Sequence, residues 1–226
     1  MLFFVKILLF IYILIFITPT NALTIPKKDN VLFDIIRKNK IIGSHEIVFE
    51  KNENNLIIKT NINIKVKALF IPVYKFSHQS NEIWKDGNFI KIDGHTDFED
   101  EREYFIKGVD EKDLFIANGM DGKLKIDKDI LPSNLWNFDI LKQKELFDTQ
   151  KGIVRTIIVK DLGSEKITIN DKVINSKKFT FNASNNPKDK GPFPEYTLWY
   201  NKNNELVKYE FINWKDDKLV QGIRRE

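Results

Sequence analysis

The sequence contains no cysteine. Disulfide bonds, thiol nucleophiles, cysteine-ligated metal centres and a lipid-modified N-terminal cysteine are therefore all excluded. The stability of the protein must come from an ordinary apolar core. A chain of about 200 residues is long enough for one, because a domain of that size buries roughly 70% of the surface that its unfolded chain exposes.

Several functional signatures are also missing. The 36 Lys and Arg and the 32 Asp and Glu residues give a net charge of +4, and the two signs are interleaved along the chain rather than gathered in a basic stripe. This pattern argues against a nucleic-acid partner. The sequence has no Gly-x-Ser-x-Gly nucleophile elbow and no phosphate-binding glycine loop. We therefore assign no catalytic residue, no cofactor and no metal ligand from sequence motifs.

Only the N-terminus carries a long apolar run. Lys6 precedes an unbroken apolar stretch, residues 7–17, and the small residues Thr20 and Ala22 stand at the two positions that a signal peptidase reads. This layout predicts a signal peptide over residues 1–22, cleavage near Ala22 and export of residues 23–226. An uncleaved membrane anchor is the alternative, but the run is shorter than the roughly 20 residues that span a bilayer. We expect membrane contact only through the signal peptide.

Most of the remaining chain alternates with a period of two, which is typical of half-buried β-strands. Residues 41–49 and 56–66 show the pattern most clearly, and the polar residues 51–55 between them predict a hairpin. Further strands are expected at residues 73–84, 89–96, 103–109, 113–117, 123–126, 154–160, 166–169, 172–181, 196–200, 206–214 and 218–223. The prediction is a mainly β, single domain over residues 23–226, built as a strongly curled antiparallel sheet (β-roll or open barrel).

Two segments break this rhythm. Apolar residues between Leu131 and Leu146 are spaced as in a helix, with Ser133 or Asn134 available as an N-cap and Gly152 as a stop. We expect one or two short helices there, lying as a lid over an open end or edge of the sheet. The segment 185–194 has three prolines and one glycine and is expected to be a surface loop.

Two of the three histidines lie in one expected hairpin, residues 74–97. A two-residue turn at Asp86-Gly87 would place Glu82 opposite Lys91 and His78 opposite His95. If this face points inward, it forms a polar patch among aromatic residues, as in a small-molecule pocket. If it points outward, the carboxylate and the lysine form a surface ion pair worth under about 1 kcal/mol. The residue pattern alone leads us to favour the outward orientation.

Candidate ligand-binding residues are the polar and aromatic members of this hairpin together with two tryptophans from elsewhere. A core role is the ordinary interpretation of such tryptophans, and lining a cavity is the alternative. A zinc site at His78, His95 and Asp97 would have suitable ligand types but no recognised spacing. The full set of candidate ligand-binding residues is Tyr74, His78, Glu82, Trp84, His95, Trp136 and Trp199.

Segments such as "IPVYKFSHQSNEIWKDGNFIKIDGHTD", "LPSNLWN" and "LWYNKNNELVKYEF" occur in an order that resembles an uncharacterised family of exported Gram-negative bacterial proteins, a domain of unknown function. The resemblance covers nearly the whole chain after residue 22, and its most specific motifs are Glu82-x-Trp84-x-x-Gly87 and Trp199-Tyr200. It implies a periplasmic, mostly β domain and brings no activity. The segment 98–103, "FEDERE", is more acidic than the polar turn usual in the family.

Three functional hypotheses follow from these patterns. The first is non-enzymatic binding of a small apolar or lipid-like ligand in the concavity of the sheet. The second is an envelope interaction protein that contacts another protein through a sheet edge or the helical segment. The third, a metal-dependent or hydrolytic enzyme on the face of His78, Glu82 and His95, has the least support. The oligomeric state is left open.

Overall fold

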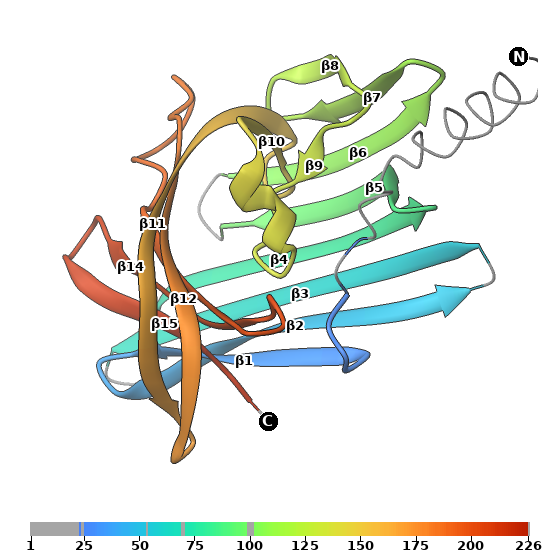
Figure 1. Ribbon diagram of the computed structural model, residues 1–226. Coiled ribbons are helices and arrows are strands. Elements are labelled where there is room, and N and C mark those ends of the chain that lie inside the picture. The colour runs from blue at the N-terminus through green and yellow to red at the C-terminus, as the bar shows by residue number, and fades with distance from the viewer. Residues whose placement is uncertain (1–22, 24, 53, 69–70, 99–101, 226) are drawn as a thin grey trace, which may run out of the picture.

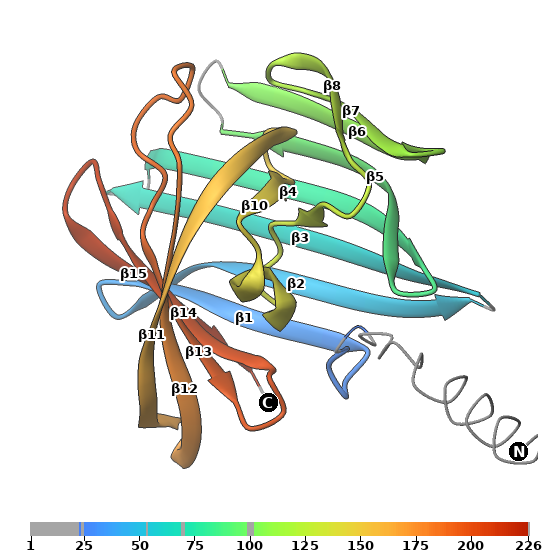
Figure 2. The ribbon, with the colours of Figure 1, turned by 45° about the horizontal axis from the view of Figure 1, so that its top comes forward.

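The computed structural model describes residues 23, 25–52, 54–68, 71–98 and 102–225. The expected signal peptide lies outside these residues. In the described part the dominant element is a single 15-stranded sheet, ordered β8-β7-β6-β5-β4-β3-β2-β1-β15-β14-β13-β12-β11-β10-β9. The mainly β fold with one strongly curled, open sheet is therefore confirmed (Figures 1 and 2). No helix among the described residues is long and apolar enough to cross a membrane.

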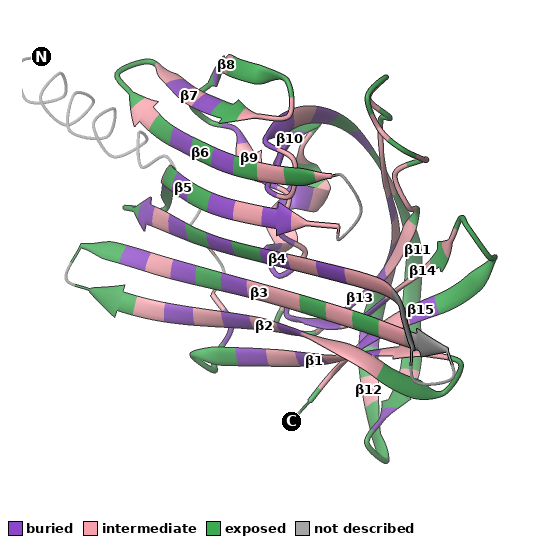
Figure 3. Ribbon diagram, turned by 180° about the vertical axis from the view of Figure 1, so that it is seen from behind, coloured by how far each residue is buried: buried purple, intermediate pink, exposed green. Residues whose placement is uncertain are grey.

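The first half of the sheet is a meander of eight strands. Its strands are β1 (Asn30–Arg37), β2 (Lys40–Asn52), β3 (Asn55–Ala68), β4 (Ile71–Lys85), β5 (Asn88–Asp97), β6 (Glu103–Glu111), β7 (Leu114–Gly119) and β8 (Gly122–Asp127). The expected hairpin over residues 41–66 is confirmed as β2 and β3. Figure 3 shows buried residues recurring along β2 to β5 between more exposed ones, as the period of two predicts.

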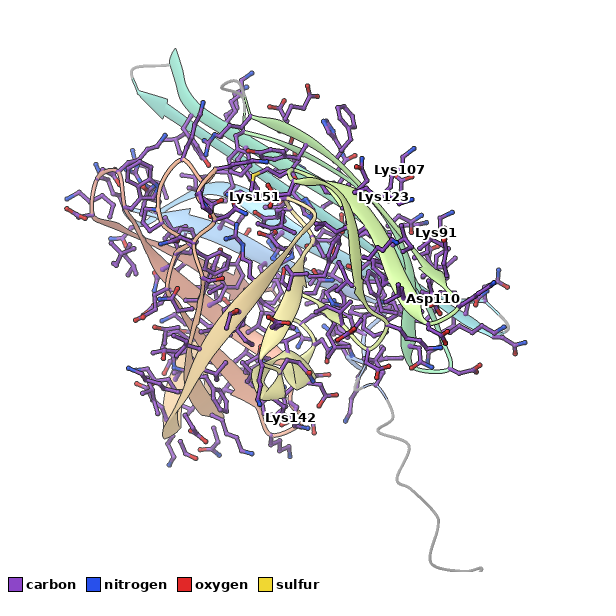
Figure 4. The ribbon with its side chains drawn as sticks, turned by 90° about the horizontal axis from the view of Figure 1, so that it is seen from above. Lys91, Lys107, Asp110, Lys123, Lys142 and Lys151 are labelled. Atoms are coloured by element: carbon purple, nitrogen blue, oxygen red, sulfur yellow. The ribbon has the colours of Figure 1, made fainter. Side chains whose placement is uncertain are left out.

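The second half contains β9 (Leu131–Pro132), β10 (Glu145–Asp148), β11 (Ile153–Ile169), β12 (Lys172–Ala183), β13 (Tyr196–Asn201), β14 (Leu206–Asn213) and β15 (Lys218–Arg224). The two halves join where β1 pairs with β15. At the other end, the turn after β7 reaches the turn before β11, and the Met120 amide donates to the Lys151 carbonyl oxygen over 2.7 Å. The sheet thus curls almost onto itself, and Lys151 lies between the two halves (Figure 4).

The interior is packed at one end of this curl. Trp84, Phe89 and Phe147 belong to one cluster of buried residues that draws on both halves of the sheet. The segment from β9 to β10 lies inside the curl rather than over its rim (Figures 1 and 2). It brings Trp136 and Ile140 into this core, with both side chains almost fully buried.

The expected helices between Leu131 and Leu146 are reduced to one 3₁₀ helix, η1 (Phe138–Lys142), capped by Asn137. The two ends of the segment are extended instead, because β9 and β10 pair with each other and β10 also pairs with the edge of β11, and residues 133–137 form a loop with a turn. Pairing with a strand edge satisfies backbone groups that a helix would leave exposed there. The apolar residues between Leu131 and Leu146 are spaced as in a helix because the segment is buried on several sides.

The two strands expected at 154–160 and 166–169 are one continuous strand, β11. The residues between them form a bulge, where Gly163 has φ of +86° and its amide donates to the Asp161 side chain over 2.7 Å. A bulge inserts extra residues without ending the pairing with the neighbouring strand. The turn-like residues therefore mark a kink in a long strand.

Candidate functional site

The hairpin of β4 and β5 has the expected turn but not the expected register. Asp86 and Gly87 have φ of 51° and 80°, and Trp84 pairs with Phe89 as predicted. Ile83 then pairs with Lys91, so Ile90 is an extra residue in β5. One extra residue shifts every later pair and moves the side chains of β5 to the other face. His78 therefore pairs with Thr96, and Glu82 with Ile92.

The predicted pairing of His78 with His95 is wrong for this reason. His95 pairs with Gln79, stacks on Phe105 and contacts Glu103 over 2.8 Å on the outer surface. His78 is only 1% exposed and lies inside. The two imidazoles face opposite sides of the sheet, so they cannot share a zinc ion. Among the described residues, no group of three or more His, Asp and Glu side chains could hold a metal ion.

The favoured outward orientation of His78 and Glu82 is also wrong. Glu82 has no exposed surface, and its carboxylate accepts hydrogen bonds from the Trp84 indole over 3.0 Å and from the Asn134 amide. Burial, opposed by these two hydrogen bonds, raises the pKa of Glu82 to about 7. An inward face is the orientation that the pocket hypothesis requires.

Next to the packed core, the other end of the interior is hollow. A cavity of about 250 Å³ lies between the inner face of β1 to β4 and the second half of the sheet. Somewhat more than half of its lining residues are aromatic, aliphatic or proline, and the others are polar or charged, with several Arg and Lys side chains among them. Apolar lining residues include Ile62, Ile64, Tyr74, Phe76, Phe181, Tyr196, Tyr209 and Phe211.

The structure brings only three of the predicted ligand-binding residues to this cavity, Tyr74, His78 and Trp136. Trp84 packs against Trp136 in the core, with ring centroids 6.2 Å apart, and Glu82 lies beside it. Trp199 is buried in a separate apolar cluster with Ile169 and Val207, and its indole donates to Glu165 over 2.8 Å. Glu82 and Trp84 lie in the core behind Trp136 and do not line the cavity. His95 and Trp199 do not reach the cavity either.

One wall of the cavity contains a buried ionic cluster that the sequence analysis missed. The Arg155 guanidinium donates to Asp148 over 2.6 Å and to Asp189 over 2.9 and 3.1 Å, and Lys151 also donates to Asp189. Burial raises the pKa of Asp189, but hydrogen bonds from Arg155 and Lys151 outweigh it and lower the pKa to about 2. The sequence does contain an indication of this cluster, because Arg155 lies between Ile153 and Ile157 on the inward face of its strand.

His45 is a second buried imidazole that lines the cavity. It stacks on Phe33 with ring centroids 5.5 Å apart, and its Nδ1 lies 3.4 Å from the Tyr209 hydroxyl. Burial, together with the nearby His78, lowers the pKa of His45 to about 3. Burial, followed by the charge of His95, lowers that of His78 to about 4. Both rings are neutral at pH 7.

A Glu82→Gln variant is expected to gain stability relative to wild type as the pH rises. The unfolded carboxyl ionises near pH 4.5 and the buried one near 7, so the wild type loses stability between these values. At about 1.4 kcal/mol per pKa unit, the relative gain is about 2 to 3 kcal/mol between pH 5 and 8.5. Urea unfolding at both pH values measures it, with Glu103→Gln as the exposed control. Equal differences at both pH values would contradict a buried neutral Glu82.

These observations define a class of protein: a curled, open β-sheet with a packed core at one end and a mostly apolar cavity at the other. Residues 33–220 match the family described as a domain of unknown function, DUF6134. The chain belongs to this family, and the resemblance to a domain of unknown function is confirmed.

A solved structure supports the same fold. The chain is similar to the crystal structure of a β-barrel-like protein of domain of unknown function DUF1849 from Brucella abortus, with a TM-score of 0.60 and 12% identity, covering 87% of this chain and 95% of that one. It also matches a putative lipoprotein from Parabacteroides distasonis, with a TM-score of 0.33 and 12% identity over 91% and 98% of the two chains. No curated protein matches the sequence.

Proposed function

We propose that this protein is exported to the periplasm and binds a small apolar or lipid-like molecule, without catalysis, in the cavity between the two halves of its sheet. The observation that carries the proposal is the cavity of about 250 Å³, more than half of whose lining residues are aromatic, aliphatic or proline. Burying apolar ligand surface there would be worth roughly 25 cal/mol per Å² before the costs of association.

The cavity has walls that are held in place before any ligand enters. Arg155 ties β10, β11 and the loop that contains Asp189 together, and it also donates to the Ser184 carbonyl oxygen over 2.7 Å. The Arg155 guanidinium further lies 5.2 Å from the centre of the Phe193 ring, which belongs to the cavity lining. A site that is largely preformed binds with a smaller ordering cost.

The first test is direct binding of N-phenyl-1-naphthylamine, an uncharged apolar fluorophore. We expect saturable binding of one molecule per chain to the wild type. Ile62→Trp places a large side chain in the cavity and is expected to weaken binding at least tenfold. Ile57→Trp, on the same strand but the opposite face, is the matched control and should change the affinity less than twofold.

A second experiment tests export and ligand binding together. The full-length chain is expressed in a Gram-negative host, so that its own N-terminal segment directs export, and the purified protein is analysed by native mass spectrometry and organic extraction. We expect residues 1–22 to be absent and an apolar molecule to co-purify stoichiometrically. Failure of the fluorophore to bind, or equal affinities of the two tryptophan variants, would contradict a cavity ligand. A clean apo mass would then favour the hypothesis of a protein partner in the envelope.

A further inference from the structure

The mouth of the cavity, where its lining residues are exposed to solvent, carries charged side chains. Lys190 and Lys215 line the cavity there, and both are exposed. Trp214, which also lines the cavity, is 50% exposed. Other lining residues, such as Phe181 and Tyr209, are buried. The cavity therefore combines an apolar interior with a charged and hydrated entrance.

Contacts between two chain segments bring the two lysines to the same part of the mouth. The Trp214 indole packs on Gly191, where an added Cβ would lie 2.4 Å from the ring. Lys190 directly precedes Gly191 between β12 and β13, and Lys215 directly follows Trp214 between β14 and β15. The Lys215 ammonium lies 5.7 Å from the centre of the Trp214 ring. The two lysines therefore flank the contact between Trp214 and Gly191.

The ionic cluster in the neighbouring wall does not offset these two charges. Asp148 and Asp189 bind Arg155, and Asp189 also binds Lys151, so the cluster has two cations and two acids. Lys190 directly follows Asp189 and adds a positive charge to this balanced cluster. Lys190 also takes part in a further interaction within the chain, so Lys215 is the principal cation of the mouth.

The acids that follow Lys215 in its turn are matched by other cations. Asp216 binds Arg37, and Asp217 is next to Lys218 in the sequence. Neither Arg37 nor Lys218 lines the cavity. The positive charge of Lys215 therefore remains available at the mouth.

Arg102 is a further cation of the lining, and its guanidinium lies 4.2 Å from the centre of the Phe98 ring. Residues 99–101, which precede it, are all acidic, so we do not count Arg102 towards the site. Even without it, the described residues that line the cavity include four cations, and Asp148 is their only acid. Such an excess of one sign attracts ligands of the opposite charge.

The interior could not neutralise a charged group. Burial lowers the pKa of His45 to about 3 and that of His78 to about 4, so both rings are neutral at pH 7. A charge placed among them would lack a counter-charge, which is strongly unfavourable. A charged headgroup belongs at the mouth, where water surrounds it and lysines can donate charge-assisted hydrogen bonds.

We propose that the ligand is an anionic amphiphile whose carboxylate or phosphate group lies at the mouth beside Lys190 and Lys215, while its apolar chain extends into the cavity. This inference rests on the proposed function, because it names the chemical class of the ligand of the same cavity. A fatty acid and an anionic phospholipid share this chemistry.

Isothermal titration with decanoate and decylamine, which have equal chain lengths and opposite charges, tests the charge preference at pH 7.5. We expect decanoate to bind at least tenfold more tightly than decylamine. Dihexanoylphosphatidylglycerol, a soluble anion with two chains, distinguishes the two sources. Tighter binding than decanoate identifies a phospholipid, and weaker binding identifies a fatty acid.

The double variant Lys190→Gln with Lys215→Gln removes both charges from the mouth. We expect its decanoate affinity, relative to its affinity for N-phenyl-1-naphthylamine, to fall about fivefold to tenfold. The uncharged fluorophore corrects for any change in the shape of the cavity. Lys202→Gln with Lys218→Gln removes the same charge from exposed residues that do not line the cavity, and this matched control should change the ratio less than twofold.

The outcomes separate the two proposals. Decylamine binding as tightly as decanoate would overturn the anionic class, and so would equal ratios in the double variant and its control. The proposed function would survive both results as long as the fluorophore binds. If neither decanoate nor the fluorophore binds, the proposed function itself fails.

Discussion

Lowering the pH from 7.5 to 4 is expected to remove about 6 kcal/mol of stability from the wild type relative to a variant that lacks His45 and His78. Their pKa values are about 3 and 4, compared with 6.5 for an ordinary histidine. The unfolded chain therefore binds these protons first as the pH falls. The stabilisation is complete above pH 6.5 and is lost towards pH 4, roughly 3 kcal/mol for each ring.

Glu82 acts in the opposite direction over part of this range. Its pKa of about 7 means that the folded protein takes up that proton first, so stability rises as the pH falls from 7 to 4.5. The net loss of the wild type is therefore smaller than the sum for the two histidines. Comparison with a variant that keeps Glu82 cancels this contribution, together with those of the other carboxyl groups.

Urea unfolding at intervals between pH 7.5 and 4 measures the effect in the wild type, in His45→Phe, in His78→Phe and in the double variant. Each single substitution is expected to flatten the acid side of the stability curve by about half. The pH dependence is compared rather than the absolute stability, so any packing cost of phenylalanine does not enter. His95→Phe removes an imidazole from the surface and serves as the control. Parallel curves for wild type and double variant would contradict buried neutral rings.

Arg155→Met is expected to destabilise the protein by about 3 to 5 kcal/mol, which is the range for removing one partner of a buried ion pair. The side chains of Arg155, Asp148 and Asp189 are 4%, 7% and 3% exposed. Without the guanidinium, Asp148 loses its ion-pair partner and Asp189 keeps only Lys151. The loop that carries Asp189 and lines the cavity would also lose its hydrogen bonds to Arg155.

A matched triple variant, Asp148→Asn with Arg155→Met and Asp189→Asn, separates the charge effect from the packing effect. It leaves no buried carboxylate unpaired, and Lys151, which loses Asp189, is 14% exposed and so keeps some contact with solvent. The triple variant is therefore expected to recover most of the lost stability. Thermal and urea unfolding measure both variants at pH 7.5, and fluorophore binding reports on the cavity wall. A triple variant no more stable than Arg155→Met would show that the guanidinium acts through packing rather than charge.

Parts of the site could be predicted from local sequence, and parts could not. The turn at Asp86-Gly87 and the pairing of Trp84 with Phe89 follow from residues that are adjacent in the chain. The pairing of His78 depends on the extra residue Ile90. Neither Ile90 nor its neighbours are residue types that predict a bulge. The side chain of Asp189, in a segment expected to be a surface loop, is only 3% exposed because Arg155 from a distant strand binds it.

The sequence by itself determined the class of fold and the positions of most strands, because the alternation of apolar and polar residues is a local property that burial must respect. Only the tertiary structure decided which interior positions are packed and which line a cavity. It also decided that Trp136 fills the inside of the curl rather than covering its rim, and that His78 and His95 lie on opposite faces. These outcomes depend on contacts between residues far apart in the chain and on single-residue shifts of register, which local patterns do not encode.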